Sequence, residues 1–272
     1  MAVTQADYSR EQVEAARSVM LELTRLLGEY RNDIVLIGGW VPELLLSGHV
    51  GSIDVDLALN HLNLQEIGYA TIEKLLIDRK YRKNTEHPYI FYRTVIIDGE
   101  EIEVEVDLLA GEYAGTGKSR RHQNVQDVKA RKARGCELAF DLASEVTISG
   151  CLPDGGKDKV KVRVASMVPF IVMKGMALYD RIKEKDAYDV YFCVKNYPGG
   201  VDALVQEFQP HKSHGLVKEA LGKIAEKFAT AEHVGPVHVV DFLQVVDEDE
   251  RERLQRDAFE RINYLVEKLV AE

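Results

Sequence analysis

The chain has 272 residues, of which 46% are hydrophobic and 29% are charged, a balance that is ordinary for a globular protein. Its formal net charge of −10 disfavours a protein that coats nucleic acid through a general positive surface. No stretch is apolar for long enough to span a bilayer, and the N-terminus lacks the pattern of a secretory signal. We therefore expect a cytoplasmic protein of one or two domains with no membrane partner.

Two classes of site are disfavoured by cysteine and histidine usage. Cys136, Cys151 and Cys193 are odd in number and far apart, so buried thiols are expected rather than a disulfide framework or a zinc site. The eight histidines show no metal-ligand spacing either.

The first elements read as helix, strand and glycine turn. Ser9 and Gln12 form a capping-box pair, which predicts a helix to about residue 30. The apolar run 34–37 predicts a short strand that ends at Gly38 and Gly39.

The next elements read as helix, strand and helix. Pro42 suits the first turn of a short helix that Gly48 would end. The alternating segment 52–59 predicts a second strand, and a helix is expected over about 64–79.

Two antiparallel hairpins follow. The β-rich runs 90–97 and 101–109 are joined through Asp98-Gly99, a dipeptide suited to the positive φ angles of a tight turn. A second hairpin is predicted from the runs 145–149 and 160–164, which flank a Pro-Asp-Gly-Gly turn.

Beyond about Ser166 the pattern is helical. The expected helices cover about 168–182, 187–195, 201–209, 215–230 and 248–270. The sequence therefore predicts an α+β fold: a domain over 1–166 with a mixed or antiparallel sheet flanked by helices, and a helical C-terminal domain over 167–272.

Three acids are candidates for metal chemistry. Asp54 and Asp56 project from the same face of one predicted strand, about 7 Å apart along the backbone. In the later hairpin strand Asp107 lies opposite the apolar face, beside Glu103 and Glu105. Carboxylate oxygens hold Mg²⁺, which neutralises a triphosphate and activates an attacking hydroxyl. The glycine turn would let backbone amides approach the phosphates.

The order of these features resembles the signature of the polymerase-β-like nucleotidyltransferases: a strand ending in Gly38-Gly39, a short helix, Asp54-x-Asp56 on a strand, and Asp107 on a later strand. The resemblance implies that the glycine pair binds a nucleoside triphosphate. It also implies that Asp54, Asp56 and Asp107 bind two Mg²⁺ ions (Mn²⁺ is an alternative), with Asp107 helping to activate the acceptor.

A second block narrows the resemblance. Residues 168–181, which include Lys174, and the Lys185-Asp186 element that follows look like the lysine helix and Lys-Asp-x-x-Asp motif of the AbiEii-type toxin nucleotidyltransferases. The resemblance implies that Lys174 contacts nucleotide phosphates, so that the helical domain contributes to the site, and that Asp186 supports it. The alternative is a structural role for both residues. The Lys174 side chain would then extend from a core helix towards solvent, and Asp186 would cap the next helix. Asp189 is expected to be structural.

One basic segment interrupts the acidic chain over 118–134. It is expected either to be a solvated helix face with a flanking loop or to hold phosphates of an RNA. Its basic residues, set against the single acid Asp127, are Lys118, Arg120, Arg121, Lys129, Arg131, Lys132 and Arg134.

The expected activity is metal-dependent transfer of a nucleoside monophosphate from a nucleoside triphosphate to an acceptor. The toxin resemblance favours RNA, in particular tRNA, or a protein hydroxyl, and implies a possible cognate antitoxin. A small-molecule adenylyltransferase, as in the aminoglycoside-modifying relatives, is the alternative, with Glu103 and Glu105 available to attract a cationic acceptor. A non-catalytic nucleotide- or partner-binding module is the third reading.

Overall fold

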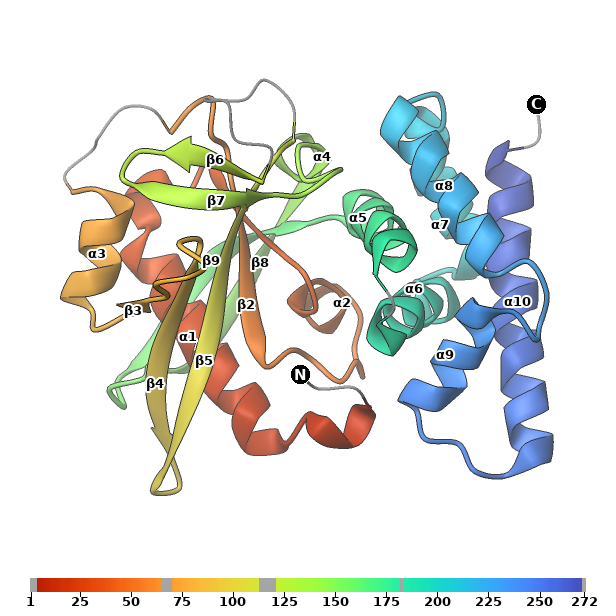
Figure 1. Cartoon of the computed structure of the whole chain (residues 1–272), viewed down its shortest axis with the longest axis horizontal. Coiled ribbons are helices and arrows are strands. Elements are labelled where there is room, and N and C mark those ends of the chain that lie inside the picture. Colours follow the sequence, from red (N-terminus) through yellow and green to blue (C-terminus); the bar gives the residue numbers. More distant parts are fainter. Residues whose placement is uncertain (1–3, 65–69, 113–120, 182, 271–272) are drawn as a thin grey trace. The chain divides into compact units, whose positions relative to one another are not determined.

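The computed structural model describes residues 4–64, 70–112, 121–181 and 183–270. It divides into two compact units (Figure 1). The sheet unit comprises Ser9–Leu45 and Gly51–Ser166. The helical unit comprises Met167–Glu272 together with the segment that ends at Tyr8 and the segment Leu46–Val50.

The sheet unit is built on one mixed sheet. Along it the strands follow the order β3-β4-β5-β2-β1-β9-β8, and a β6–β7 hairpin joins it through β7, which pairs with β5. The pairs β1–β9, β2–β5 and β5–β7 are parallel, and the others are antiparallel. The bounds are β1 Ile34–Ile37, β2 Asp54–Leu59, β3 Arg82–Lys83, β4 Ile90–Ile97, β5 Glu100–Ala110, β6 His122–Val125, β7 Val128–Lys132, β8 Ala143–Cys151 and β9 Lys157–Ala165.

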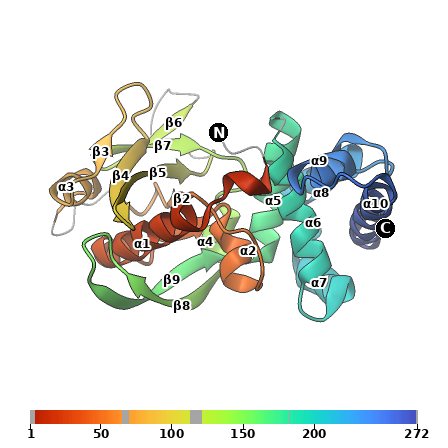
Figure 2. The ribbon, with the colours of Figure 1, turned by 90° about the horizontal axis from the view of Figure 1, so that it is seen from below.

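Helix α1 (Arg10–Leu26) lies against one face of this sheet, where it contacts β2, β4, β5, β8 and β9 (Figures 1 and 2). The predicted capping box is confirmed, because Ser9 accepts from the Gln12 amide and Gln12 accepts from the Ser9 amide. Arg93 of β4 donates to Glu22 of α1, and Arg93 pairs in register with Val104 of β5. Val104 and Val106 therefore face α1, while Asp107 faces the other side of the sheet.

Both predicted hairpins are confirmed. Asp98 and Gly99 have φ angles of 52° and 87°, as the tight turn between β4 and β5 requires. Strands β8 and β9 pair over their whole length from Ala143↔Ala165 to Cys151↔Lys157.

In its described part the sheet unit contains the α-helices α1, α2 (Trp40–Leu45), α3 (Ile72–Asp78) and α4 (Leu138–Asp141), and a 3-10 helix at Gly28–Tyr30. The predicted helix over 64–79 begins later than expected, at Ile72, and part of that range, 65–69, lies outside the described residues. The prediction of a helical face over 118–134 is wrong for 121–134, the described part of that segment. It forms the β6–β7 hairpin, because Val128 and Ala130 alternate with Lys129 and Arg131 along β7.

The helical unit contains α5 (Met167–Asp180), α6 (Glu184–Asn196), α7 (Gly200–Phe208), α8 (Gly215–Lys227), α9 (Val234–Phe242) and α10 (Glu248–Val270). All were expected from the sequence except α9. Its Gly235-Pro236 pair reads as a loop signal, yet Pro236 sits in the first helical turn, where its missing amide costs nothing. Gly235 packs against α8, since a Cβ there would lie 2.6 Å from the Lys227 carbonyl oxygen.

The chain is thus a mixed α/β protein with a mixed sheet flanked by helices and a helical C-terminal region, as expected at that level. Among the described residues no helix is both long and apolar enough to cross a membrane. Cys136 and Cys193 are buried as expected, but Cys151, at the end of β8, is exposed.

Candidate active site

Three aspartates come together on the sheet face that is turned away from α1, and we refer to Asp54, Asp56 and Asp107 as the acid cluster. Strands β2 and β5 are parallel neighbours, and Asp56 stands directly opposite Asp107 in their register. Register partners on adjacent strands lie about 5 Å apart and point to the same face. Asp54 lies two residues before Asp56, on that same face, and opposite Glu105.

The glycine turn lies directly against this cluster. Gly38 follows β1, whose last residue, Ile37, pairs with Asp56. Its φ is +72°, and a Cβ at this position would lie 1.9 Å from Oδ2 of Asp56. A side chain at residue 38 would therefore collide with the carboxylate, so both the backbone conformation and the contact require glycine here. Gly39 follows it, buried, at the start of the turn into α2.

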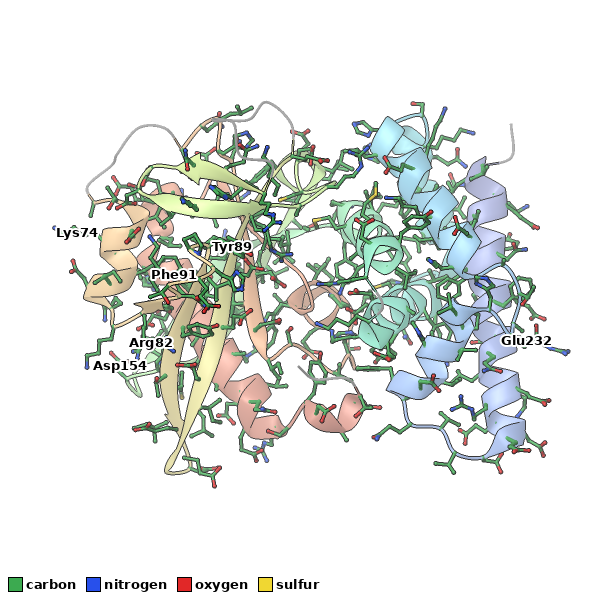
Figure 3. The ribbon with its side chains drawn as sticks, viewed as in Figure 1. Lys74, Arg82, Tyr89, Phe91, Asp154 and Glu232 are labelled. Carbon is green, nitrogen blue, oxygen red and sulfur yellow. The ribbon has the colours of Figure 1, made fainter. Side chains whose placement is uncertain are left out.

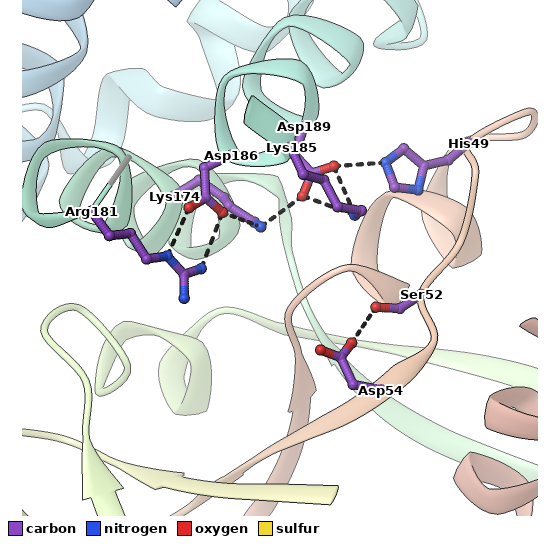
Figure 4. A network of polar contacts seen from close by, with 8 residues as sticks. All are labelled: His49, Ser52, Asp54, Lys174, Arg181, Lys185, Asp186 and Asp189. Carbon is purple, nitrogen blue, oxygen red and sulfur yellow. Dashed lines mark hydrogen bonds and ion pairs between the residues drawn. The ribbon is translucent and has the colours of Figure 1, made fainter. Parts of the chain in front are cut away.

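The start of β2 is fixed by two contacts. The Trp40 indole Nε1 donates to the Asp54 carbonyl oxygen at 2.8 Å, and Trp40 is itself buried. Ser52 donates its hydroxyl to Oδ1 of Asp54 (Figure 4). These bonds hold the Asp54 backbone and carboxylate in place before any ligand binds.

Asp107 is the most buried acid of the cluster. Its side chain is 9% exposed, and its Oδ1 is buried without a hydrogen-bond partner. Burial raises the pKa of Asp107 to about 6, and the negative charges of Glu105 and Asp54 add to the rise, although Arg131 opposes it. A carboxylate in this position gains from a cation, because an unpaired buried oxygen is costly.

Arg131 supplies positive charge to the cluster. It stands on β7, opposite Leu109 of β5, and its Nη2 donates to Oδ2 of Asp107 at 2.5 Å. The guanidinium also lies 6.0 Å from the ring of Tyr89. Tyr89, which is labelled in Figure 3, directly precedes β4. One edge of the acid cluster is therefore closed by an ion pair.

The donor set suits a hard divalent cation, which prefers carboxylate oxygens. The buried, unpartnered Oδ1 of Asp107 and the close fit of Gly38 against Asp56 are what such a site would require. Within the described residues, however, no three acidic, histidine or cysteine side chains already converge as a metal cage does. Arg131, bound to one oxygen of Asp107, offers a physical reason.

The other two predicted site residues, Lys174 and Asp186, belong to a buried ion-pair network in the helical unit (Figure 4). The Lys174 ammonium lies 2.8 Å from Oδ1 of Asp186 and 2.6 Å from Oδ2 of Asp189. Burial alone would lower the pKa of Lys174, but the two carboxylates outweigh it and raise that pKa. Arg181 donates two further bonds to Asp186.

The network continues beyond these residues. Asp189 also accepts from Lys185, at 3.0 Å, and lies 2.9 Å from Nε2 of His49, and all three side chains are buried. Burial by itself would raise the pKa of Asp189, yet its cations hold that pKa well below the ordinary value, while burial lowers the pKa of His49. We refer to His49, Lys174, Arg181, Lys185, Asp186 and Asp189 as the ion-pair network.

The structure thus brings Gly38, Asp54, Asp56 and Asp107 together on one sheet face. Lys174 and Asp186 lie together in the helical unit, where each already has partners of opposite charge. Their contact with a nucleotide stays a prediction.

Sequence reasoning missed two groups. From the sequence, Arg131 is expected on a solvated face or in contact with RNA, and not at the acid cluster. The alternation of apolar and basic residues over 128–131 is the signal that could have indicated a strand, and β7 places Arg131 next to β5. Glu137, just before α4, has both carboxylate oxygens buried without a hydrogen-bond partner, and burial raises its pKa. We see no sequence signal for this second group.

A cavity of about 70 Å³ lies elsewhere in the sheet unit, between α1 and strands β1, β2 and β9. It opens on the α1 face and is lined largely by apolar side chains, including Leu23, Leu36 and Leu57. It is therefore separate from the acid cluster, which occupies the opposite face.

Comparison of the chain with protein-family models, with curated proteins and with solved structures finds no match in any of the three.

Proposed function

We propose that this chain is a metal-dependent nucleotidyltransferase with a polymerase-β-like catalytic domain in its sheet unit. One observation carries the proposal: Asp56 and Asp107 stand in register on adjacent parallel strands, with Gly38 packed directly against Asp56. This arrangement brings residues that are far apart in the sequence together on one sheet face, which supports a shared metal site. The divalent ions, held by Asp54, Asp56 and Asp107, would supply charge neutralisation of the triphosphate.

The protein groups would act as follows. Gly38 and Gly39 leave room for the triphosphate at the edge of the acid cluster. An acceptor hydroxyl attacks the α-phosphorus, a new P–O bond forms, and the bond to the departing pyrophosphate breaks in line. Asp107, which lies on the same face as Asp56, would receive the hydroxyl proton as the acceptor attacks.

The acceptor that we favour is RNA, in particular tRNA, or a protein hydroxyl, as in the toxin enzymes that the motifs resemble, and a cognate antitoxin belongs to the same proposal. The β6–β7 hairpin supports an RNA acceptor, because Lys132 on β7 and Arg121, which directly precedes β6, lie next to the C-terminal end of β5, the strand that bears Asp107. Residues 118–120 of the basic segment lie outside the described residues.

A small cationic acceptor is the second candidate, and it too has a supporting observation. Glu105 stands opposite Asp54 on the face of the acid cluster, and Glu103 lies two residues earlier on β5. Glu103 is already bound to Arg82 at 2.6 Å, which leaves Glu105 as the better attractor of a cation. A non-catalytic module would keep the same fold without transfer.

The test is to incubate the purified chain with each labelled nucleoside triphosphate, Mg²⁺ and either total RNA, a protein lysate or an aminoglycoside. We expect label on one acceptor class, and loss of at least roughly a thousandfold of the rate in Asp56→Asn, because that change removes charge from the metal site. Asp33→Asn is the matched control, since Asp33 lies outside the cluster, just before β1. Absence of transfer to every acceptor would favour the non-catalytic module.

A further inference from the structure

The pairing of Arg131 with Asp107 places a cation at the position where the proposed function needs a metal. The side chain of Asp107 is 9% exposed and that of Arg131 is 37% exposed, so the pair is screened from water on its acidic side. Oδ2 of Asp107 accepts from Arg131, and its Oδ1 has no hydrogen-bond partner. Arg131 thus balances part of the charge of Asp107 while leaving one oxygen unsatisfied.

The backbone of Arg131 is held from two sides. At its C-terminal end β7 pairs with β5, through Leu109↔Arg131 and Ala110↔Lys132. At the other end the hairpin turn is fastened to the start of α3, where Asp127 accepts from the Glu73 amide at 3.2 Å and Gln126 accepts from the Ile72 amide at 3.2 Å. A change of partner by Arg131 therefore needs rotation of its side chain, not movement of the hairpin.

An arginine and a divalent cation compete for the same carboxylate. With Asp54, Asp56 and Asp107 on one face, a dication neutralises more charge than one guanidinium does, and it can use the oxygen that Arg131 leaves unpaired. The Tyr89 ring, 6.0 Å from the guanidinium, offers the displaced side chain an aromatic face. A dication bound to Asp107 would thus replace the charge that Arg131 supplies.

We propose that Arg131 is the resident counter-ion of Asp107, and that a divalent cation binds the acid cluster by displacing it. The proposal rests on the proposed function for the existence of the metal site. It makes Arg131 a positioning residue that sets the metal affinity and keeps the acid cluster stable when no metal is bound. Removing its charge should therefore tighten metal binding while lowering the stability of the metal-free protein.

The test is calorimetric titration of Mn²⁺ into the full-length chain, with no nucleotide present. We expect Arg131→Gln to bind Mn²⁺ roughly tenfold more tightly than the wild type, because a competing cation is gone. Lys129→Gln removes the same charge two residues earlier on β7 and should leave the affinity within about twofold. In an Asp107→Asn background the Arg131→Gln effect should vanish, as a double-mutant cycle would show.

Thermal melting without metal checks that each variant folds. If Arg131→Gln fails to fold, Arg131→Lys keeps the charge but loses the planar fork, and should still bind Mn²⁺ roughly two- to threefold more tightly. Equal tightening in Lys129→Gln, or weaker binding in the Arg131 variants, would overturn the displacement model. Unchanged binding in those variants would overturn it too, but would leave the proposed function standing. Absence of Mn²⁺ binding in the wild type and in all variants would overturn both the displacement model and the proposed function.

Discussion

The molecule holds two groups of charged side chains that differ in how fully they are neutralised. In the acid cluster, Arg131 is paired with one oxygen of Asp107, and the other oxygen of Asp107 is buried without a hydrogen-bond partner. In the ion-pair network, two aspartates are bound by Lys174, Lys185 and Arg181. The pKa of Asp107 is raised to about 6, whereas those of Asp186 and Asp189 are lowered.

The acid cluster would therefore be stabilised by a bound cation, whereas the charges of the ion-pair network are already balanced within the protein. A buried carboxylate with a raised pKa is destabilising when ionised, so a bound cation would stabilise it. Carboxylates with lowered pKa values are already stabilised by their own cations, and removing one cation is costly. The contrast favours the acid cluster as the chemical centre and a structural role for Asp186 and Asp189.

The first prediction concerns the space beside Asp56. Gly38→Ala should lower transfer at least roughly a hundredfold, because the new Cβ would lie 1.9 Å from the Asp56 carboxylate oxygen and must displace it. Gly155→Ala is the matched control, since Gly155 has φ +89° but nothing within 4 Å of a Cβ. Both changes should cost about 1–2 kcal/mol of stability from the positive φ. Equal activity in the two variants would show that the fit against Asp56 is unimportant.

The acid cluster and its glycine turn also show which features could be predicted from the sequence. Strand alternation, a local signal, predicts the faces on which Asp54, Asp56 and Asp107 lie, and the motif resemblance singles them out together with the glycine turn. The β4–β5 hairpin was predicted because Asp98-Gly99 is a strong turn signal. The β6–β7 hairpin was not, because its turn uses Gln126 at φ 51°, a residue with no turn preference.

Long-range pairs lay beyond sequence reasoning. His49 and Asp189 are 140 residues apart, and Arg131 and Asp107 are 24 apart on strands whose register no motif reports. Such pairings depend on tertiary packing, so only a structure reveals that Lys174 already has two carboxylate partners.

The second prediction tests whether the ion-pair network is structural. Lys174→Met should reduce the free energy of unfolding of the helical unit by about 3–5 kcal/mol, because it leaves buried Asp186 and Asp189 short of a cation. Lys218→Met, an exposed lysine on α8, should change it by less than about 0.5 kcal/mol. Urea unfolding followed by circular dichroism measures both. A Lys174→Met protein of normal stability that has lost triphosphate affinity would instead support the predicted phosphate contact.

The last prediction concerns pH, and it probes the acid cluster directly. An aspartate whose pKa is raised in the folded state binds its proton more tightly there, so its contribution to stability falls as pH rises from about 4 to about 6 and stays low above that. Asp107→Asn removes this titration. In a chelating buffer the variant should therefore gain stability relative to the wild type as pH rises through this window, by up to about 3 kcal/mol. Asp186 and Asp189 have the opposite sign: their stabilising contribution is present above about pH 4 and is lost as pH falls further. Urea titrations of the two proteins at intervals from pH 4.5 to 8 measure the difference. A difference that does not change with pH would mean that Asp107 is fully compensated by Arg131, and the contrast between the two groups of charges would then disappear.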